Sequence, residues 1–233
     1  MKKTIVCGLL FLLLLVPQAF AQQADDFEWE VNDRQNAAIT GYTGDDRAVV
    51  IPNELGGFPV TTVNGSAFAN KELICVIIPD SVTSIARRAF ANNKLTSVDL
   101  PDGLSLIGDG AFANNRLAGI SIPTGVTGFG YGAFAHNRLT SINLPDSVRY
   151  IDPATFANNR LTGIVIPSGV EEIGAGAFAC NPLTSITIGS DVKLRWEVLW
   201  GSDSFDRAYM DGGKLAGTYT RANAESTEWV RDE

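Results

Sequence analysis

Residues whose side chains could perform acid–base, nucleophilic or metal chemistry are few and widely spaced in this sequence. The chain has one histidine, His136, and three cysteines, Cys7, Cys75 and Cys180. A hydrolytic triad needs a nucleophile and a base within hydrogen-bond reach, and a structural zinc site needs four clustered ligands. Neither pattern is present, and no group of acidic residues has the spacing of metal ligands. The sequence therefore predicts a protein without catalytic residues, a metal or another cofactor.

Charged residues that recur every 22 residues are better candidates for a functional site than the histidine and cysteines. The basic set, called the basic column below, is Lys94, Arg116, Arg138 and Arg160. The acidic set at the same interval is Asp80, Asp102 and Asp146. Two like charges about 4.8 Å apart in water repel by roughly 1 kcal/mol, so a basic column has a small cost unless its long side chains splay apart. It is either a solvated edge of the fold or one rim of a binding surface.

A 22-residue unit, written five times from 79 to 188, explains this spacing. Its phenylalanines are Phe90, Phe112, Phe134, Phe156 and Phe178, and prolines and leucines recur in step with them. A fixed period of this length is typical of a solenoid. One copy has too few apolar residues to fold alone, so stacking of the copies must bury them.

The apolar pattern within one copy predicts its local structure. Leu95, Val98 and Leu100 recur as apolar residues while the positions between them vary, which is typical of a strand with one side in the core. Stacked copies would pair these strands into a parallel sheet, and the proline that follows each one would end it. Residues 108–114 are expected to form a single helical turn that places Phe112 in the core. A helical turn is wider than a strand, so we expect the sheet on the concave side.

A column of asparagines follows the phenylalanines without exception. Its members are Asn93, Asn115, Asn137, Asn159 and Asn181. We expect buried amides that satisfy backbone groups where the coil turns into the strand. His136 and Cys180 occupy the preceding column, whose polar residues vary, so that column is expected to face solvent.

The sequence outside the repeats divides the chain into four parts. Residues 1–21 have the basic start, the short apolar run and the Ala-Phe-Ala end of a cleaved signal peptide. About 12 apolar residues are too few to cross a membrane, so no transmembrane segment is expected after cleavage. We predict an N-terminal cap at 22–50 with a β-hairpin, and a six-coil solenoid at 51–188 whose first coil, 51–78, is irregular. An irregular α+β cap is expected at 189–233, with a helix at 202–210.

Charge and cysteine content restrict the partners and the covalent structure. Loss of the signal peptide removes two lysines and no acidic residue, so the mature net charge is 16 minus 26, or −10. This charge argues against a nucleic-acid ligand, whose phosphates require a basic surface. Cys75 and Cys180 lie five coils apart, about 24 Å, where a disulfide tolerates under about 7 Å. They are therefore expected to remain thiols.

The repeat closely resembles the Treponema-type, or BspA-like, leucine-rich repeat. The resemblance rests on Ile-Pro-Asp-Ser-Val-Thr-Ser-Ile at 78–85 and Ala-Phe-Ala-Asn-Asn-Lys-Leu-Thr-Ser-Val-Asp-Leu at 89–100. The segments 38–44 and 214–221 also resemble flanks in that family, so the similarity extends over about 27–221. Many family repeats have a cysteine where this chain has the asparagine column.

The resemblance implies a fold, a location and a kind of partner. The fold would be a right-handed leucine-rich-repeat coil with a parallel concave sheet, short helical turns on the convex side and capped ends. The protein would be bacterial, located in the secreted fraction, at the cell surface or in the periplasm. It would adhere to host matrix or surface proteins, or to an envelope protein of another cell. The alternative is a periplasmic scaffold that self-associates or binds envelope proteins without a host partner.

The candidate binding surface consists of the outward-facing positions of the sheet and the basic column beside it. These residues are Lys94, Ser97, Asp99, Arg116, Ser121, Arg138, Ser141, Asn143, Arg160, Val165 and Thr187. Their side chains are mostly small, so we expect a flat surface without a deep pocket.

Overall fold

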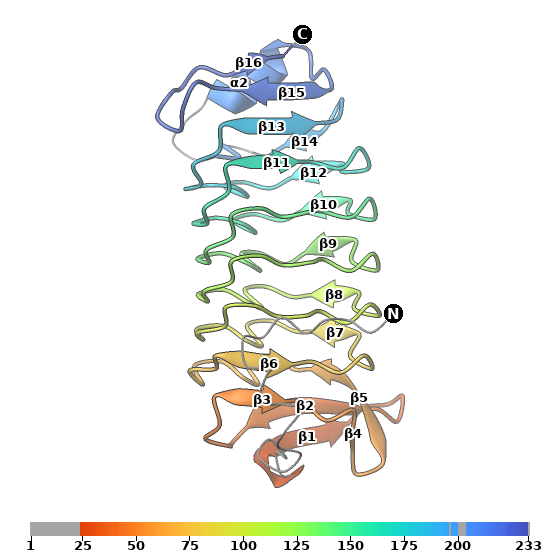
Figure 1. Cartoon of the computed structure of the whole chain (residues 1–233). Helices are drawn as coiled ribbons and strands as arrows, with labels where there is room; N and C mark the ends of the chain where they lie inside the picture. The colour runs from red at the N-terminus through yellow and green to blue at the C-terminus, as the bar shows by residue number, and fades with distance from the viewer. Residues whose placement is uncertain (1–23, 196, 200–203, 233) are drawn as a thin grey trace, which may run out of the picture.

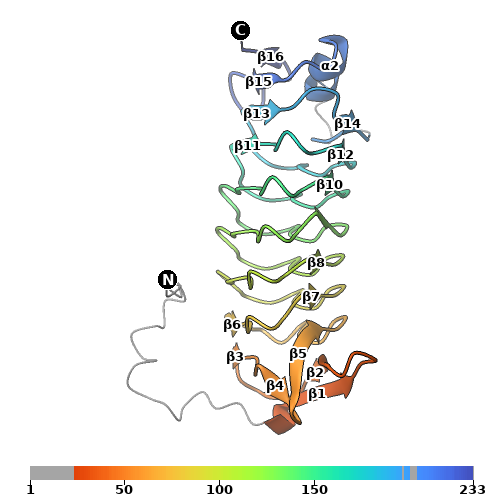
Figure 2. The same cartoon turned by 90° about the vertical axis from the view of Figure 1, so that its right-hand side faces the viewer.

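The computed structural model describes residues 24–195, 197–199 and 204–232. They form a β-solenoid of about seven coils, stacked in a nearly straight column with a cap at each end (Figures 1 and 2). The expected repeat solenoid is thereby confirmed. The predicted signal peptide at 1–21 lies outside the described residues.

Short parallel strands connect the coils on two different sides of the column. One side carries two sheets built from β5 (Phe58–Val63), β7 (Ser84–Ile85) and β8 (Leu106–Ile107), and from β9 (Gly128–Phe129), β10 (Tyr150–Ile151), β12 (Glu172–Ile173) and β14 (Lys193–Leu194). The other side, called the strand face below, carries β3 (Ala48–Val50), β6 (Cys75–Ile77), β11 (Gly163–Val165) and β13 (Ser185–Ile188). The first of these ladders was not predicted, because only its inward-pointing residues were recognised.

The strands expected at 95–100 and equivalent positions form only in part. In the middle coils this segment is extended but joined to its neighbours by isolated bonds, such as the Ser121–Asn143 bridge. The N–H of Arg116 donates to the carbonyl of Leu95 at 2.8 Å, and the N–H of Ala118 donates to that of Thr96 at 3.2 Å. The coils therefore remain connected on this side without a continuous ladder.

Tight turns replace the expected helical turn between 86 and 92 and in the equivalent segments. Arg88 and Asn92 have φ angles of 57° and 58°, in the left-handed region. A left-handed residue interrupts a right-handed helix, so no helix forms anywhere in 79–188. The N–H of Phe90 donates instead to Ala111 of the next coil at 2.8 Å. These turns thus add hydrogen bonds between coils.

The phenylalanine column forms the centre of the core. From Phe68 to Phe178, consecutive rings are stacked with centroids 5.1 to 5.8 Å apart. All of these side chains are buried. Tyr42 extends the stack at its N-terminal end, 5.5 Å from Phe68. The predicted core position of the phenylalanines is therefore confirmed.

The N-terminal cap is the predicted hairpin, preceded by a short 3-10 helix at Ala24–Asp26. β1 (Phe27–Val31) pairs antiparallel with β2 (Ala37–Tyr42), and β2 pairs parallel with β5. Phe27 and Tyr42 thereby close the end of the apolar core. The irregular stretch that follows forms a second hairpin, in which β4 (Glu54–Leu55) pairs with β5 across Gly56 and Gly57. Both glycines have positive φ, as a tight hairpin turn requires.

The C-terminal cap combines a helix with two antiparallel strands. The predicted helix is present as α2 (Ser204–Asp211), and Gly213 with a φ of 78° follows it. β15 (Gly217–Thr220) pairs with β13, and β16 (Val230–Arg231) pairs with β15. The buried side chains of this cap are Phe205, Tyr209, Tyr219 and Trp229. Figure 1 shows α2, β15 and β16 at the far end of the column, which they close.

Cys75 and Cys180 do not pair with each other, as the stacking distance required. Cys75 is half-buried in β6, and Cys180 is exposed.

Candidate functional site

Hydrogen-bonded asparagines fix the backbone next to each residue of the basic column. The amide nitrogen of Asn115 donates to the carbonyl oxygens of Phe90 at 2.9 Å and Phe112 at 3.1 Å. Its oxygen accepts the N–H of Leu95 at 3.1 Å. Asn93, Asn137, Asn159 and Asn181 make equivalent bonds. The predicted structural role of this column is confirmed, and each basic residue directly follows one of these fixed points.

Three arginines of the basic column present their charge to solvent. Arg116, Arg138 and Arg160 are exposed, and among the described residues none of them is in an ion pair. Lys94 differs, because its ammonium group lies 2.8 Å from the carboxylate of Glu72. That hydrogen bond and the charge of Lys94 lower the pKa of Glu72, with help from Arg47. The unneutralised part of the column is thus the three arginines.

The other predicted site residues lie beside them on the strand face. Asp99, Ser121, Ser141 and Asn143 are exposed, and Ser97 is half-buried. Val165 is 64% exposed, the largest exposed fraction among the large apolar side chains of the described residues. Together these residues make a surface of small side chains with low relief.

Thr187, the last predicted member, lies where the C-terminal cap joins the strand face. Its hydroxyl is 2.9 Å from that of Thr218 in β15. The cap therefore closes the candidate surface at this end, and Thr187 is less accessible than the prediction assumed.

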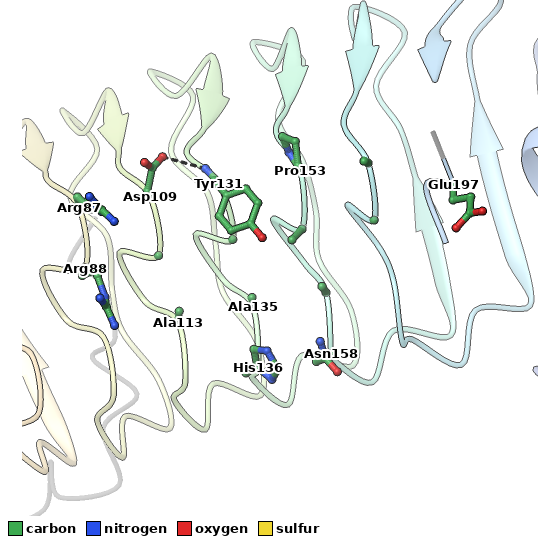
Figure 3. Close-up of a pocket in the computed structure, with 16 residues that line it drawn as sticks. Arg87, Arg88, Asp109, Ala113, Tyr131, Ala135, His136, Pro153, Asn158 and Glu197 are labelled. Atoms are coloured by element: carbon green, nitrogen blue, oxygen red, sulfur yellow. Dashed lines mark hydrogen bonds between the residues drawn. The ribbon is translucent and has the colours of Figure 1, made fainter. Parts of the chain in front are cut away.

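A groove on a different side of the coils was not anticipated from the sequence. It runs along the tight turns for several coils and has a volume of about 740 Å³ (Figure 3). Its floor consists of glycine and alanine: Gly110, Ala113, Gly132, Ala135, Ala154, Ala157 and Gly176. Tyr131, which is 60% exposed, stands along one side of the floor, and His136 and Asn158 stand along the other.

Charges of opposite sign lie at the two ends of this groove. Arg87 and Arg88 line its N-terminal end and Glu197 its C-terminal end (Figure 3). Asp109 also lines the groove, and one of its carboxylate oxygens accepts the backbone N–H of Tyr131 at 3.0 Å. Glycine at three of the five positions in the column of Gly110 was the sequence signal that could have indicated a low floor.

Comparison with solved structures supports the fold. The leucine-rich repeat protein of T. pallidum is 29% identical with a TM-score of 0.62, over 68% of this chain and 88% of that one. A leucine-rich cell surface protein of Faecalibacterium prausnitzii is 30% identical with a TM-score of 0.57, over 74% of this chain and 55% of that one. The pneumococcal vaccine antigen PcpA shares the fold with a TM-score of 0.61 and 21% identity. The match covers 74% of this chain and 50% of that one.

The remaining findings concern membrane-spanning helices, the curated proteins and the family. Within the described residues, no helix combines the length and the apolar character that crossing a bilayer requires. None of the curated proteins compared is significantly similar to the chain. The family model of the BspA-type leucine-rich repeat region matches residues 61–184 in six copies. The chain therefore belongs to the BspA-type leucine-rich repeat family.

Proposed function

We propose that this protein is a non-enzymatic, secreted or surface-exposed module that binds another protein and thereby contributes to bacterial adhesion. Membership of the family supports a protein-interaction module, and a cell surface protein is among its structural relatives. The partner is a host matrix or surface protein, or an envelope protein of another cell.

One observation carries the proposed binding surface. Arg116, Arg138 and Arg160 form a row of exposed cations that make no ion pair with any residue that the structure describes, beside the small outward side chains of the strand face. A row of this kind favours a partner with an acidic counter-surface. Exposed charges of this type accelerate and orient association more than they increase final affinity. The small residues allow a broad, flat contact without steric obstruction.

A second candidate function is self-assembly in the periplasm, which the open sheet edges favour. β1 and β16 are terminal strands of their sheets at opposite ends of the column. Val31 in β1 is 41% exposed and Val230 in β16 is 58% exposed. An exposed edge strand can pair with another chain. Edges at opposite ends would join copies head to tail, which generates filaments when the arrangement does not close.

Localisation combined with binding assays distinguishes the two functions. Adhesion predicts the protein in the medium or on intact cells, and direct binding of residues 22–233 to purified host matrix proteins. Release only by osmotic shock, with binding to envelope extract and concentration-dependent polymers, supports the scaffold instead. Failure to bind any of these proteins while the chain is folded and monomeric would contradict both.

A further inference from the structure

The groove lined by the tight turns has the shape of a track for an extended chain. Position 88 of the first regular coil and its equivalents have positive φ angles, including 57° at Gly110 and 58° at Gly132. The backbone therefore turns sharply at this position in each coil. The alanines that share the floor, such as Ala113 and Ala135, add only methyl groups. The result is a continuous shallow channel parallel to the column.

The two ends of the groove carry charged side chains of opposite net sign, with Asp109 beside the two arginines. Among the described residues, none of Arg87, Arg88 and Glu197 is in an ion pair. Arg87 and Arg88 are exposed, and Glu197 is exposed five repeats further along. Five coil spacings of about 4.8 Å separate the two ends by about 24 Å.

These features together select one kind of occupant. We propose that the groove binds an extended peptide segment of a partner protein, with an acidic residue at the arginine end and a basic residue at the Glu197 end. A length of about 24 Å corresponds to about seven extended residues at about 3.3 Å each. Small side chains suit the positions that point to the floor, because the floor consists of glycine and alanine and lies close to the peptide backbone. Tyr131 contacts the middle of the segment from one side.

The site is separate from the strand face and uses none of its residues. The proposed function and the groove can therefore fail independently. The strand face offers a broad surface bordered by a row of three arginines, whereas the groove offers a narrow track with opposite charges at its two ends. Two opposite charges at a fixed separation give peptides with different charge patterns different affinities. This difference in affinity would make the groove specific for certain sequences.

Three labelled, end-capped peptides of seven residues test the proposal. The first carries Glu at one end and Lys at the other, the second Glu at both ends and the third Lys at both ends, with alanine and serine between. We expect the folded chain to bind the first peptide about tenfold more tightly than either of the others, because each competitor replaces one favourable charge pair with a contact between like charges. Both chain directions of the first peptide are included, because the charges alone do not determine its direction.

Charge reversal provides the decisive control. The double change Arg87→Glu and Arg88→Glu makes both ends acidic, so the preference should switch to the peptide with two lysines. Glu197→Lys makes both ends basic and should switch the preference to the peptide with two glutamates. The triple change Arg34→Ser, Lys193→Ser and Arg207→Ser, at exposed positions that do not line the groove, should leave all three affinities unchanged. A preference that does not follow these reversals would overturn the proposal.

A substitution in the floor tests the shape of the groove independently of its charge. Ala113 is half-buried and lines the floor, so Ala113→Leu should obstruct the track and weaken all peptides without lowering the melting temperature substantially. If the first peptide fails to bind the native chain even at millimolar concentration, or binds Ala113→Leu equally well, the groove is not a peptide site.

Discussion

The side-chain amide of Asn137 bonds to two coils at once. Its nitrogen donates to the carbonyl oxygens of Phe112 at 2.9 Å and Phe134 at 3.1 Å, and its oxygen accepts the N–H of Leu117 at 3.0 Å. These bonds replace the continuous strand pairing that is missing in the middle coils. The asparagine column is therefore a polar cross-link that runs beside the apolar core.

Asn137→Ala should lower the free energy of unfolding by about 2–4 kcal/mol. The change leaves buried carbonyl oxygens and one buried N–H without their partner, and each such group costs about 1–3 kcal/mol. Chemical denaturation measures the loss. Asn143→Ala is the matched control, because Asn143 is exposed on the strand face and should change stability by less than about 0.5 kcal/mol. Equal effects of the two changes would contradict the cross-link.

Phe134→Ala should destabilise the protein by about 3–5 kcal/mol. Phe134 is fully buried between Phe112 at 5.6 Å and Phe156 at 5.8 Å. The substitution therefore removes apolar contacts and opens a cavity in the middle of the stack. Thermal and chemical denaturation of the variant measure the cost.

Deletion of the entire coil 123–144 is the control for that substitution. The deletion removes one full period and rejoins equivalent positions, so the shortened chain should fold and melt cooperatively. An unfolded deletion variant together with an unaffected Phe134→Ala variant would show that the coils do not stack as independent units.

Asp152→Asn should raise the melting temperature at pH 7 and have little effect at pH 3. Burial raises the pKa of Asp152, and the charges of Asp109 and Glu172 add to the effect. A raised pKa in the folded state means that folding favours the protonated carboxyl group. Its favourable contribution is complete below the pKa of the unfolded chain and is lost as pH rises through the higher folded pKa. The ionised carboxylate therefore costs stability at neutral pH, and asparagine avoids that cost.

Melting curves at the two pH values provide the measurement for Asp152. Asp80→Asn, at an exposed position, should have little effect at either pH. A similar gain for Asp152→Asn at both pH values would mean that the carboxylate charge is not the cause.

Replacing Arg116, Arg138 and Arg160 together by serine should leave folding intact and slow association with the natural partner of the strand face. The three guanidinium groups are exposed and have no intramolecular ion pair within the described residues. Their loss should also reduce the dependence of the association rate on salt. Stopped-flow or surface-binding kinetics at two ionic strengths measure both effects.

The charge-matched control for this triple variant replaces Arg34, Lys193 and Arg207 by serine. These residues are exposed but lie away from the strand face. If this control slows association as much as the triple variant, the effect comes from net charge and the basic column is only a solvated edge.

The repeat period was sufficient to predict the coil, the core and the polar cross-link. Phe112 and Asn115 have equivalents in every regular copy, so their environments had to be the same in each coil, and the structure confirms this. The hairpin at the N-terminus was also predictable, because Phe27 and Trp29 alternate with acidic residues. Residue types that recur in every copy thus identified the side chains of the interior.

The ladder that runs from β5 to β14 and the groove were not predictable because their columns vary. The outward positions of that ladder hold Leu106, Tyr150 and Glu172, which show no common polarity. The left-handed turn position holds Arg88 and Ala154 as well as glycines, and neither residue type favours a positive φ. Contacts between neighbouring coils impose these conformations, and the sequence of a single copy does not reveal those contacts.

The orientation of the bonds between coils also determines how the molecule responds to a pulling force. The strands run across the column, so hydrogen bonds such as Phe90 to Ala111 point along its length. Tension applied between the two ends loads these bonds one row at a time, as in the opening of a zipper. We therefore expect the solenoid to extend coil by coil under moderate force instead of unfolding in a single event. Each coil that detaches would lengthen the chain, so the work of pulling would be dissipated in several small steps.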